Sequence, residues 1–234
     1  MIGKGFYING NLFYDGKWVD SYPSSNCVEL FYPNNILWYK GGMKKGKKKS
    51  FGIEYWQSGH KKIEAVFKDG EINDANAMSY SNEGYLEFKG QFSKGVRNGF
   101  GESYYKNGNI KMSGTWKNML CSSKTGKIYY EEKATLKYSG ALVNNNRDGF
   151  GTEYHPNGEI KYTGNFAMGK YEDKNVSDLD ENGRIIYKGD FVNGVYNGYG
   201  ILYHPDSKKK SLEGKFLDGL LEDKMGRIYD ENET

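Results

Sequence analysis

The fold is decided by one segment, Tyr187-Lys188-Gly189-Asp190-Phe191-Val192-Asn193-Gly194-Val195-Tyr196-Asn197-Gly198-Tyr199-Gly200. Its first part alternates buried-type residues (Tyr187, Gly189, Phe191) with Lys188 and Asp190, which is the period of a strand with one buried face. Its second part continues the alternation, with Tyr199, Ile201 and Tyr203 on one face. Two such strands around Asn193-Gly194 predict a β-hairpin.

The pattern recurs along the whole chain. A small residue in the place of Gly189 returns every 24 to 26 residues, at Gly16, Gly41, Ala65, Gly90, Gly114, Gly140, Gly164, Gly189 and Gly214. Ten residues earlier, or eleven in the last unit, stands an aromatic residue in eight of nine cases, at Phe6, Phe31, Tyr55, Tyr80, Tyr104, Tyr130, Tyr154, Leu179 and Tyr203. The repeat predicts a single array over residues 1–234, with a partial unit at 1–13 and units beginning near Tyr14, Tyr39, Glu64, Phe88, Met112, Tyr138, Tyr162, Tyr187 and Leu212.

Glycines mark the connections and also fall inside strands. A turn position precedes each repeat glycine by six residues, at Gly10, Asn35, Gly59, Gly84, Gly108, Ala134, Gly158, Gly183 and Lys208. Asn-Gly pairs such as Asn107-Gly108 favour two-residue type I′ hairpin turns, which need positive φ at both central residues. For strand glycines such as Gly198 and Gly200 we favour a role in making room for an aromatic ring of the same or the next unit; the alternative is that they are ordinary turn glycines.

Alternate units share a further feature, which gives a second period of about twice the repeat length. Four units carry an aromatic residue before the second strand glycine, at Phe51, Phe100, Phe150 and Tyr199, 49 or 50 residues apart. The intervening units carry polar sequence there, such as residues 71–76 and 171–175. We hypothesise that these divergent segments contact a partner; drift after duplication of a hairpin pair is the alternative.

The segment from Tyr187 to Gly200 resembles the MORN repeat, whose pattern is Y-x-G-x-W/F-x-x-G-x-x-x-G-x-G. Phe88 to Gly101 follows it with Phe for the first Tyr, and Tyr138 to Gly151 with Asn145 for one glycine. The resemblance implies an all-β fold, an elongated and twisted single-layer array of antiparallel hairpins. It also implies a scaffold in cytoskeletal, ciliary or membrane-junction assemblies, with phosphoinositide binding proposed for some members. Related repeats occur in bacterial effector and toxin–antitoxin proteins, so an effector or immunity-type protein is a further alternative.

Composition excludes several classes of protein. Glycine supplies 32 and tyrosine 21 of the 234 residues, the glycines lack the three-residue period of collagen, and the net charge of +3 is too small for a typical disordered chain. No apolar run is long enough to cross a membrane, and no signal peptide is evident. Cys27 and Cys121 form no disulfide framework or zinc motif. We therefore expect a cytoplasmic protein, with a cytoskeletal or ciliary association as the resemblance implies.

The sequence offers little for catalysis. His155-Pro156 and His204-Pro205 occupy the same place in their repeats, so we interpret them as copies of one turn position rather than as metal or acid–base groups. Neither they nor His60 belong to a catalytic motif, and the repeats leave no residues for a catalytic domain. We expect no catalytic, metal-binding or cofactor-binding residue, and a non-enzymatic protein that binds other proteins of a larger complex.

One hairpin connection is strongly basic, with Lys44, Lys45, Lys47, Lys48 and Lys49 within six residues. Such a cluster can hold a protein on an anionic phospholipid surface or contact a partner; a solvated loop is the alternative. The aromatic residues beside lysines also resemble a nucleic-acid stacking surface, but they recur at buried-type positions, so nucleic acid is a poor candidate. Exposed edge strands at the ends of an array would permit end-to-end or edge-strand self-association.

Overall fold

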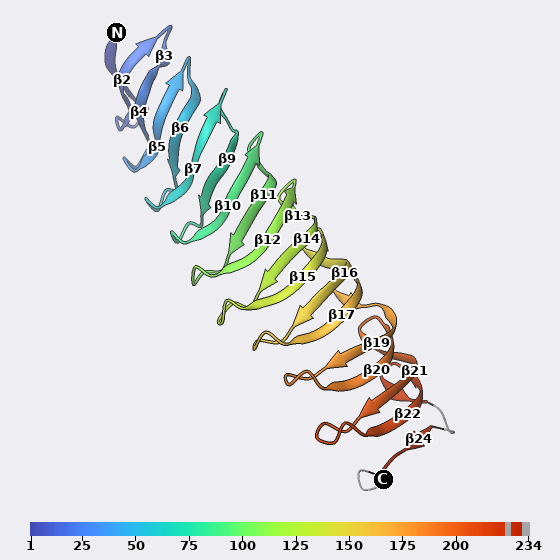
Figure 1. Ribbon diagram of the computed structural model, residues 1–234. Coiled ribbons are helices and arrows are strands. Elements are labelled where there is room, and N and C mark those ends of the chain that lie inside the picture. Colours follow the sequence, from blue (N-terminus) through green and yellow to red (C-terminus); the bar gives the residue numbers. More distant parts are fainter. Residues whose placement is uncertain (223–225, 231–234) are drawn as a thin grey trace. The chain divides into compact units, whose positions relative to one another are not determined.

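The computed structural model describes residues 1–222 and 226–230 of the chain. Every regular element among these residues is a β-strand (Figure 1). The chain divides into two compact units, Met1–Met119 and Leu120–Thr234, and each is described by itself. The prediction of an all-β, open array of antiparallel hairpins is confirmed.

The first unit consists of antiparallel hairpins that follow one another in chain order (Figure 1). Its strands are β1 (Ile2–Phe6), β2 (Leu12–Val19), β3 (Tyr22–Pro23), β4 (Ser25–Phe31), β5 (Leu37–Lys44), β6 (Lys47–Tyr55), β7 (Lys61–Lys68), β8 (Glu71–Ile72), β9 (Asp74–Tyr80), β10 (Leu86–Ser93), β11 (Val96–Tyr104) and β12 (Ile110–Lys117).

The second unit is built in the same way. Its strands are β13 (Leu120–Cys121), β14 (Ser123–Tyr129), β15 (Leu136–Val143), β16 (Asn146–Tyr154), β17 (Ile160–Ala167), β18 (Lys170–Tyr171), β19 (Asp173–Leu179), β20 (Ile185–Val192), β21 (Val195–Tyr203), β22 (Lys210–Leu217), β23 (Leu220–Leu221) and β24 (Arg227–Ile228).

Two kinds of hairpin alternate within each unit. In one kind the second strand is continuous, as in β6, β11, β16 and β21; in the other it is broken into a short and a long piece, as in β8 and β9 or β18 and β19. At the break, carboxylate oxygens of Asp74 accept hydrogen bonds from the backbone N–H groups of Val66 (2.7 Å) and Asn76 (2.8 Å). Asp173 accepts a hydrogen bond from the backbone N–H of Asn165, which corresponds to Val66, and one from the N–H of the next residue, Lys174. The polar residues of the divergent segments thus have a local structural role.

The turn chemistry differs from the prediction. At Asn107-Gly108 only Gly108 has a positive φ (+88°), and the Asn107 side chain accepts a hydrogen bond from the Asn109 backbone (3.0 Å). This is a longer loop closed by a left-handed residue rather than a type I′ turn. Positive φ at two consecutive central residues occurs instead at the opposite end of the hairpins, for example at Asn193 and Gly194. The predicted single turn positions are confirmed as left-handed residues, including the non-glycines Asn35, Ala134 and Lys208.

One predicted repeat position is shifted. The loop before β15, like the loop before β22, is one residue longer than the other loops of its kind, so β14 ends at Tyr129, and Tyr130 already lies in the loop. Tyr129, not Tyr130, therefore matches Tyr104 and Tyr154 at the ends of β11 and β16. The insertion that lengthens this repeat falls after Tyr129, which the repeat spacing alone could not locate.

The two strand glycines of a regular hairpin are needed for different structural reasons. A Cβ atom on Gly200 would lie 2.3 Å from the hydroxyl oxygen of Tyr187, and one on Gly151 would lie equally close to that of Tyr138. These glycines make room for a ring of their own hairpin, as predicted. Gly198 instead adopts a φ of +76°, a left-handed backbone conformation that favours glycine. The prediction that Gly198 makes room for a ring is therefore wrong, because a Cβ atom there would meet the side chain of Asp190 and no ring. Gly198 and Gly200 both lie inside β21, so neither is an ordinary turn glycine.

Aromatic rings form the core of each unit. The side chains of Tyr138, Tyr162 and Tyr187 are fully buried, as are those of Tyr14, Tyr39 and Phe88. Rings of consecutive hairpins meet edge to face, with centroids 5.6 Å apart for Tyr187 and Phe216. Such pairs are favourable because the positive edge of one ring meets the negative face of the other. Aromatic residues therefore replace the aliphatic core that this sequence lacks.

Candidate interaction surfaces

Each hairpin has two faces with different chemistry. We call the face that carries the buried rings of Tyr39, Phe88, Tyr138 and their equivalents the inner face, and the opposite face the outer face. Residues alternate between the faces along each strand.

On the inner face, basic side chains lie over the buried rings. The Lys48 ammonium lies 5.2 Å from the ring centroid of Tyr39 and 4.8 Å from that of Trp38. The Arg97 guanidinium lies 4.5 Å from the centroid of Phe88, and that of Arg147 lies 4.8 Å from Phe166. Cations at this distance are attracted to the ring faces.

The same strand position is occupied differently in other hairpins. Tyr196 stacks on Tyr187 with centroids 3.7 Å apart, and Tyr171 stacks on Tyr162 at 3.9 Å. All these residues sit opposite the apolar residue two places after the repeat glycine, as Tyr196 pairs with Phe191. We call this strand site the cover position. The function of this position was not predicted from the sequence, although basic residues recur there 49 and 50 residues apart at Lys48, Arg97 and Arg147.

Two of the basic cover residues have a close carboxylate partner in their own strand. Lys48 contacts Glu54 and Arg147 contacts Glu153, both at 2.5 Å. The place equivalent to Glu54 next to Arg97 is taken by Ser103, and within the part of the chain that the structure describes the one ion-pair partner of Arg97 is Glu87, at 3.8 Å. Its Nε atom is buried without a hydrogen bond, and burial lowers the pKa of the guanidinium.

The second unit contains a buried acidic side chain, Asp178, whereas Arg97 in the first unit is a largely buried basic one. Asp178 is 8% exposed, its Oδ1 atom has no hydrogen-bond partner, and no cation lies within ion-pair distance among the described residues. Burial raises the pKa of this carboxyl group, with Glu153 adding to the rise and Lys161 opposing it. Its backbone neighbours across the strands are Tyr162 and Tyr187.

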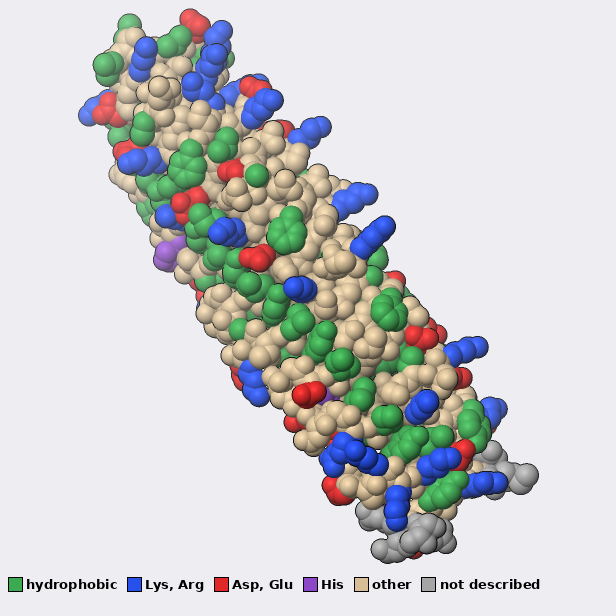
Figure 2. All heavy atoms as spheres, viewed as in Figure 1, with side chains coloured by type: hydrophobic (Ala, Val, Ile, Leu, Met, Phe, Trp, Pro, Cys, Tyr) green, Lys and Arg blue, Asp and Glu red, His purple; other side chains and the backbone are tan. Residues whose placement is uncertain are grey.

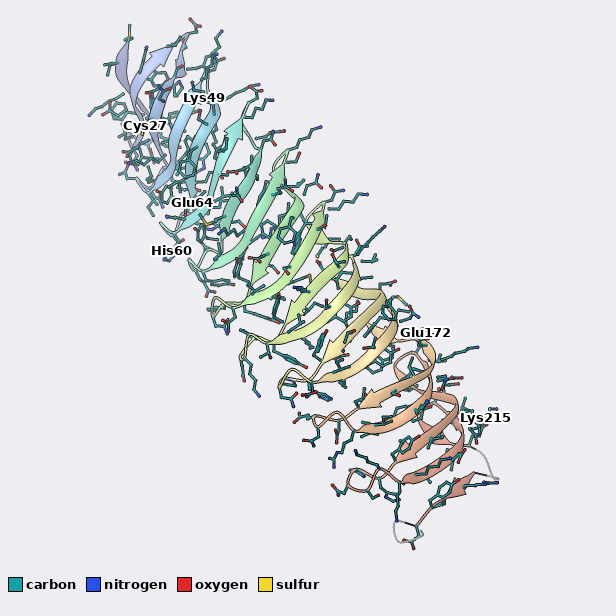
Figure 3. All side chains as sticks on the ribbon, viewed as in Figure 1. Cys27, Lys49, His60, Glu64, Glu172 and Lys215 are labelled. Carbon is teal, nitrogen blue, oxygen red and sulfur yellow. The ribbon has the colours of Figure 1, made fainter. Side chains whose placement is uncertain are left out.

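A ladder of side-chain hydrogen bonds connects successive hairpins at their long loops. The residue after the strand end donates to a backbone carbonyl of the next hairpin, as Tyr32 does to Tyr55 (2.8 Å) and Tyr130 to Tyr154 (2.8 Å). His155 occupies the same place, with Nε2 2.8 Å from the carbonyl oxygen of Leu179, and His204 Nε2 lies 3.3 Å from that of Tyr229. The two histidines are thus equivalent structural donors, whereas His60 is exposed in a loop of the first unit (Figure 3).

The outer face exposes large aromatic rings at a regular place. The exposed fractions are 57% for Phe51 and 63% for Phe100 in the first unit, and 62% for Phe150 and 60% for Tyr199 in the second. These are the aromatic residues of the regular hairpins, and each precedes the glycine that accommodates the inner ring. Figure 2 shows hydrophobic side chains exposed between charged ones on the face in view.

The structure divides the predicted lysine cluster. Lys44, Lys45 and Lys47 are exposed, and Lys49 is half-buried in β6 (Figure 3). The Lys48 side chain is only 15% exposed and is held by Glu54. Lys48 is therefore not available to a lipid or partner in this arrangement, and lipid binding stays a prediction for the other four lysines.

The remaining predicted residues are structural. Gly16, Gly41, Gly90, Gly114, Gly140, Gly164, Gly189 and Gly214 lie within the first strands of their hairpins, and Tyr55, Tyr80, Tyr104, Tyr154 and Tyr203 are half-buried at strand ends. Cys121 is buried, which raises the pKa of its thiol to about 11, and Cys27 is exposed. Among the described residues no cluster of three metal-ligating side chains occurs, and none forms a helix that could cross a membrane.

Comparison with known families accounts for this geometry. The sequence profile of the MORN repeat matches residues 39–61, 88–110, 138–160 and 187–209. The chain is a MORN-repeat protein. The four matches are the regular hairpins with continuous second strands, and the divergent hairpins between these MORN repeats share their β-structure without matching the profile. No curated protein matched the MORN-repeat chain.

Proposed function

We propose that this MORN-repeat protein is a non-enzymatic scaffold whose hairpins bind other proteins in a larger assembly. The observation that carries the proposal is the set of outer-face rings, Phe51, Phe100, Phe150 and Tyr199, each more than half exposed. Aromatic side chains offer large contact areas at low conformational cost and are enriched at protein interfaces. The hairpins that carry these outer-face rings are stabilised by fully buried rings and by the hydrogen bonds between successive loops, so the outer-face rings stand on rigid elements.

The finer form of the proposal places the chain in the cytoplasm, in a cytoskeletal, ciliary or membrane-associated assembly. It is supported by the MORN repeat itself, together with the absence of a catalytic motif in the sequence. Cross-linking mass spectrometry on native material tests it. We expect cross-links from lysines beside the outer rings, such as Lys215 across from Tyr199, to lysines of one or a few other proteins. Cross-links confined to this chain would contradict the proposal.

Membrane tethering is the second candidate function, because Lys44, Lys45 and Lys47 remain exposed at one end of a hairpin. Each lysine near an anionic lipid surface contributes about 1 kcal/mol. Co-sedimentation with vesicles that contain phosphoinositides, compared with neutral vesicles at low and high salt, tests it. Salt-sensitive binding that Lys44→Glu and Lys45→Glu abolish would support tethering, and equal recovery with both kinds of vesicle would exclude it.

A further inference from the structure

The cover position of the first broken hairpin carries a short side chain. Pro23 in β3 pairs with Trp18, as Tyr171 pairs with Phe166 and Tyr196 with Phe191. The tyrosines stack over buried rings of their hairpins, but a proline ring cannot extend as far. The inner face is therefore left open beside Pro23.

A pocket of about 470 Å³ occupies this place in the first unit. Its walls are formed by the large apolar side chains Phe13, Trp18, Leu30, Trp38 and Met43, together with Pro23. Leu30 stands where the equivalent residues of other hairpins are Glu54 and Glu153, so the pocket floor lacks their carboxylate. Pockets of about 300–1,000 Å³ with apolar walls and few polar groups are typical binding sites.

The charges at the pocket have one sign. None of its lining residues is acidic, and two are lysines, Lys47 and Lys48. Lys48 is neutralised by Glu54, whereas Lys47 is exposed and makes no ion pair among the described residues. An occupant that buries an apolar group and places an acidic group beside it would satisfy both features.

A second pocket shows that the apolar character is specific to this hairpin. It measures about 260 Å³, lies beside Ile72 at another short cover residue, and is lined by charges of both signs, including Glu54, Glu87 and Arg97. Charged side chains already paired with each other leave little reason for an apolar group to enter. The pocket beside Pro23 is the one whose chemistry selects a partner.

We propose that the pocket beside Pro23 binds a peptide segment of a partner protein, in which a bulky apolar side chain enters between Trp18 and Trp38 and an adjacent Asp or Glu pairs with Lys47. This inference rests on the proposed function as a protein-binding scaffold and specifies one of its contact sites. It also gives part of the lysine-rich hairpin a role in recognition.

The probes are short blocked peptides that carry Phe beside Glu, with matched peptides that carry Ala for Phe or Gln for Glu. Binding to the full chain is measured by calorimetry. We expect the Phe–Glu peptide to bind, the Ala peptide not to bind, and the Gln peptide to bind severalfold more weakly. Ion pairs at an exposed lysine are worth about 0.2–1 kcal/mol, which corresponds to a loss of up to about fivefold.

Three variants locate the site. Pro23→Tyr places at the cover position the residue found at 171 and 196, so it should fill the pocket, preserve the fold and weaken the Phe–Glu peptide at least about tenfold. Lys47→Glu should weaken it severalfold. Lys89→Glu changes the same charge at an exposed residue that lines no described pocket and should have no effect. Circular dichroism and thermal unfolding confirm that each variant is folded.

Equal binding of the Phe–Glu peptide to wild type and Pro23→Tyr, or no binding of any peptide, overturns the pocket proposal. Binding of phosphatidylserine vesicles that Pro23→Tyr abolishes, without peptide binding, also overturns it and assigns the pocket to lipid. A cross-linked partner that binds wild type and Pro23→Tyr equally removes the pocket but leaves the scaffold function standing. Peptide binding without any cross-linked partner supports the pocket but contradicts the scaffold function.

Discussion

At the scale of single residues, the pairing of a glycine with a buried ring is what allows the regular hairpin. Gly200 Cα lies against the hydroxyl end of Tyr187, and the Tyr187 hydroxyl donates to the Asp190 carbonyl at 3.1 Å. The Tyr187 side chain thus lies along the strand, with its hydroxyl group held by the Asp190 carbonyl oxygen. Any side chain at position 200 would occupy the same space.

Gly200→Val should therefore lower the free energy of unfolding by about 1–3 kcal/mol, because the added methyl groups force the Tyr187 ring to move. Urea unfolding of the purified chain measures the change. Lys174→Ala serves as the control, since Lys174 is exposed and its replacement should change stability by no more than about 0.5 kcal/mol. A neutral Gly200→Val variant would disprove the role assigned to this glycine.

The buried carboxyl group of Asp178 accepts a hydrogen bond from the Tyr196 hydroxyl but leaves its Oδ1 atom without a partner, and it allows a prediction about pH. Burial raises the pKa of this carboxyl group in the folded protein above that of an aspartate exposed to water. As the pH rises, the unfolded chain therefore loses this proton first, and the free energy of unfolding falls over the interval between the two pKa values. Stability that is present at low pH is thus lost toward neutrality.

Asp178→Asn removes this loss. At pH 7 we expect the variant to be more stable than wild type, because the amide is neutral whereas burial disfavours the charged carboxylate. The advantage should shrink below about pH 4, where Asp178 is protonated in both states. Thermal unfolding of both proteins from pH 3 to pH 8 provides the comparison. A constant difference at every pH would show that the effect is not electrostatic.

At the scale of elements, neighbouring hairpins are joined by the ladder of loop donors as well as by backbone pairing. Tyr130 in the loop before β15 donates to Tyr154 at the end of β16. The bond spans 24 residues, so it closes a connection between successive repeats rather than within one strand pair.

Tyr130→Phe removes only the hydroxyl and should cost about 0.5–1.5 kcal/mol, the net worth of one hydrogen bond. Tyr55→Phe is the matched control, because the Tyr55 hydroxyl donates no hydrogen bond among the described residues. Urea midpoints at constant m-value distinguish the two. Equal shifts for both variants would contradict the ladder.

Much of the element scale could be predicted from the sequence. The strands around Gly189 were predictable because a strand with one buried face alternates apolar and polar residues. The left-handed turn positions were predictable because positive φ favours Gly and Asn. The turn type was wrong because Asn-Gly suits both a two-residue turn and a longer loop that ends in a left-handed glycine. The cover residues Lys48, Arg97 and Arg147 escaped notice because their role depends on cross-strand register, which the repeat spacing does not specify. The pocket beside Pro23 depends on the same register.

At the scale of the whole molecule, the chain contains two units of similar hairpins, and each hairpin contacts mainly its neighbours. In such proteins stability is close to a sum of repeat and neighbour terms. Gly200→Val should accordingly speed amide hydrogen exchange in β20, β21 and β22 and leave exchange in β5, β6 and β7 unchanged. Mass-spectrometric exchange on the intact chain resolves these segments. Uniform acceleration throughout would mean that the molecule unfolds as one unit.

Function at this scale depends on how many hairpins take part in binding. The outer rings occur twice in each unit, which suits a partner that contacts several repeats at once. Several weak contacts on linked hairpins can together give strong binding. This is the physical basis for expecting a scaffold rather than a single-site binder.

The most direct test is the affinity of the cross-linked partner for two versions of the full chain. One is wild type, and the other carries Phe51→Ser, Phe100→Ser, Phe150→Ser and Tyr199→Ser, all at exposed positions. With folding verified by circular dichroism, the account predicts at least about a tenfold loss of affinity in the serine variant, since each buried ring contributes 1 kcal/mol or more. Unchanged affinity would contradict the claim that the outer aromatic residues form the binding surface.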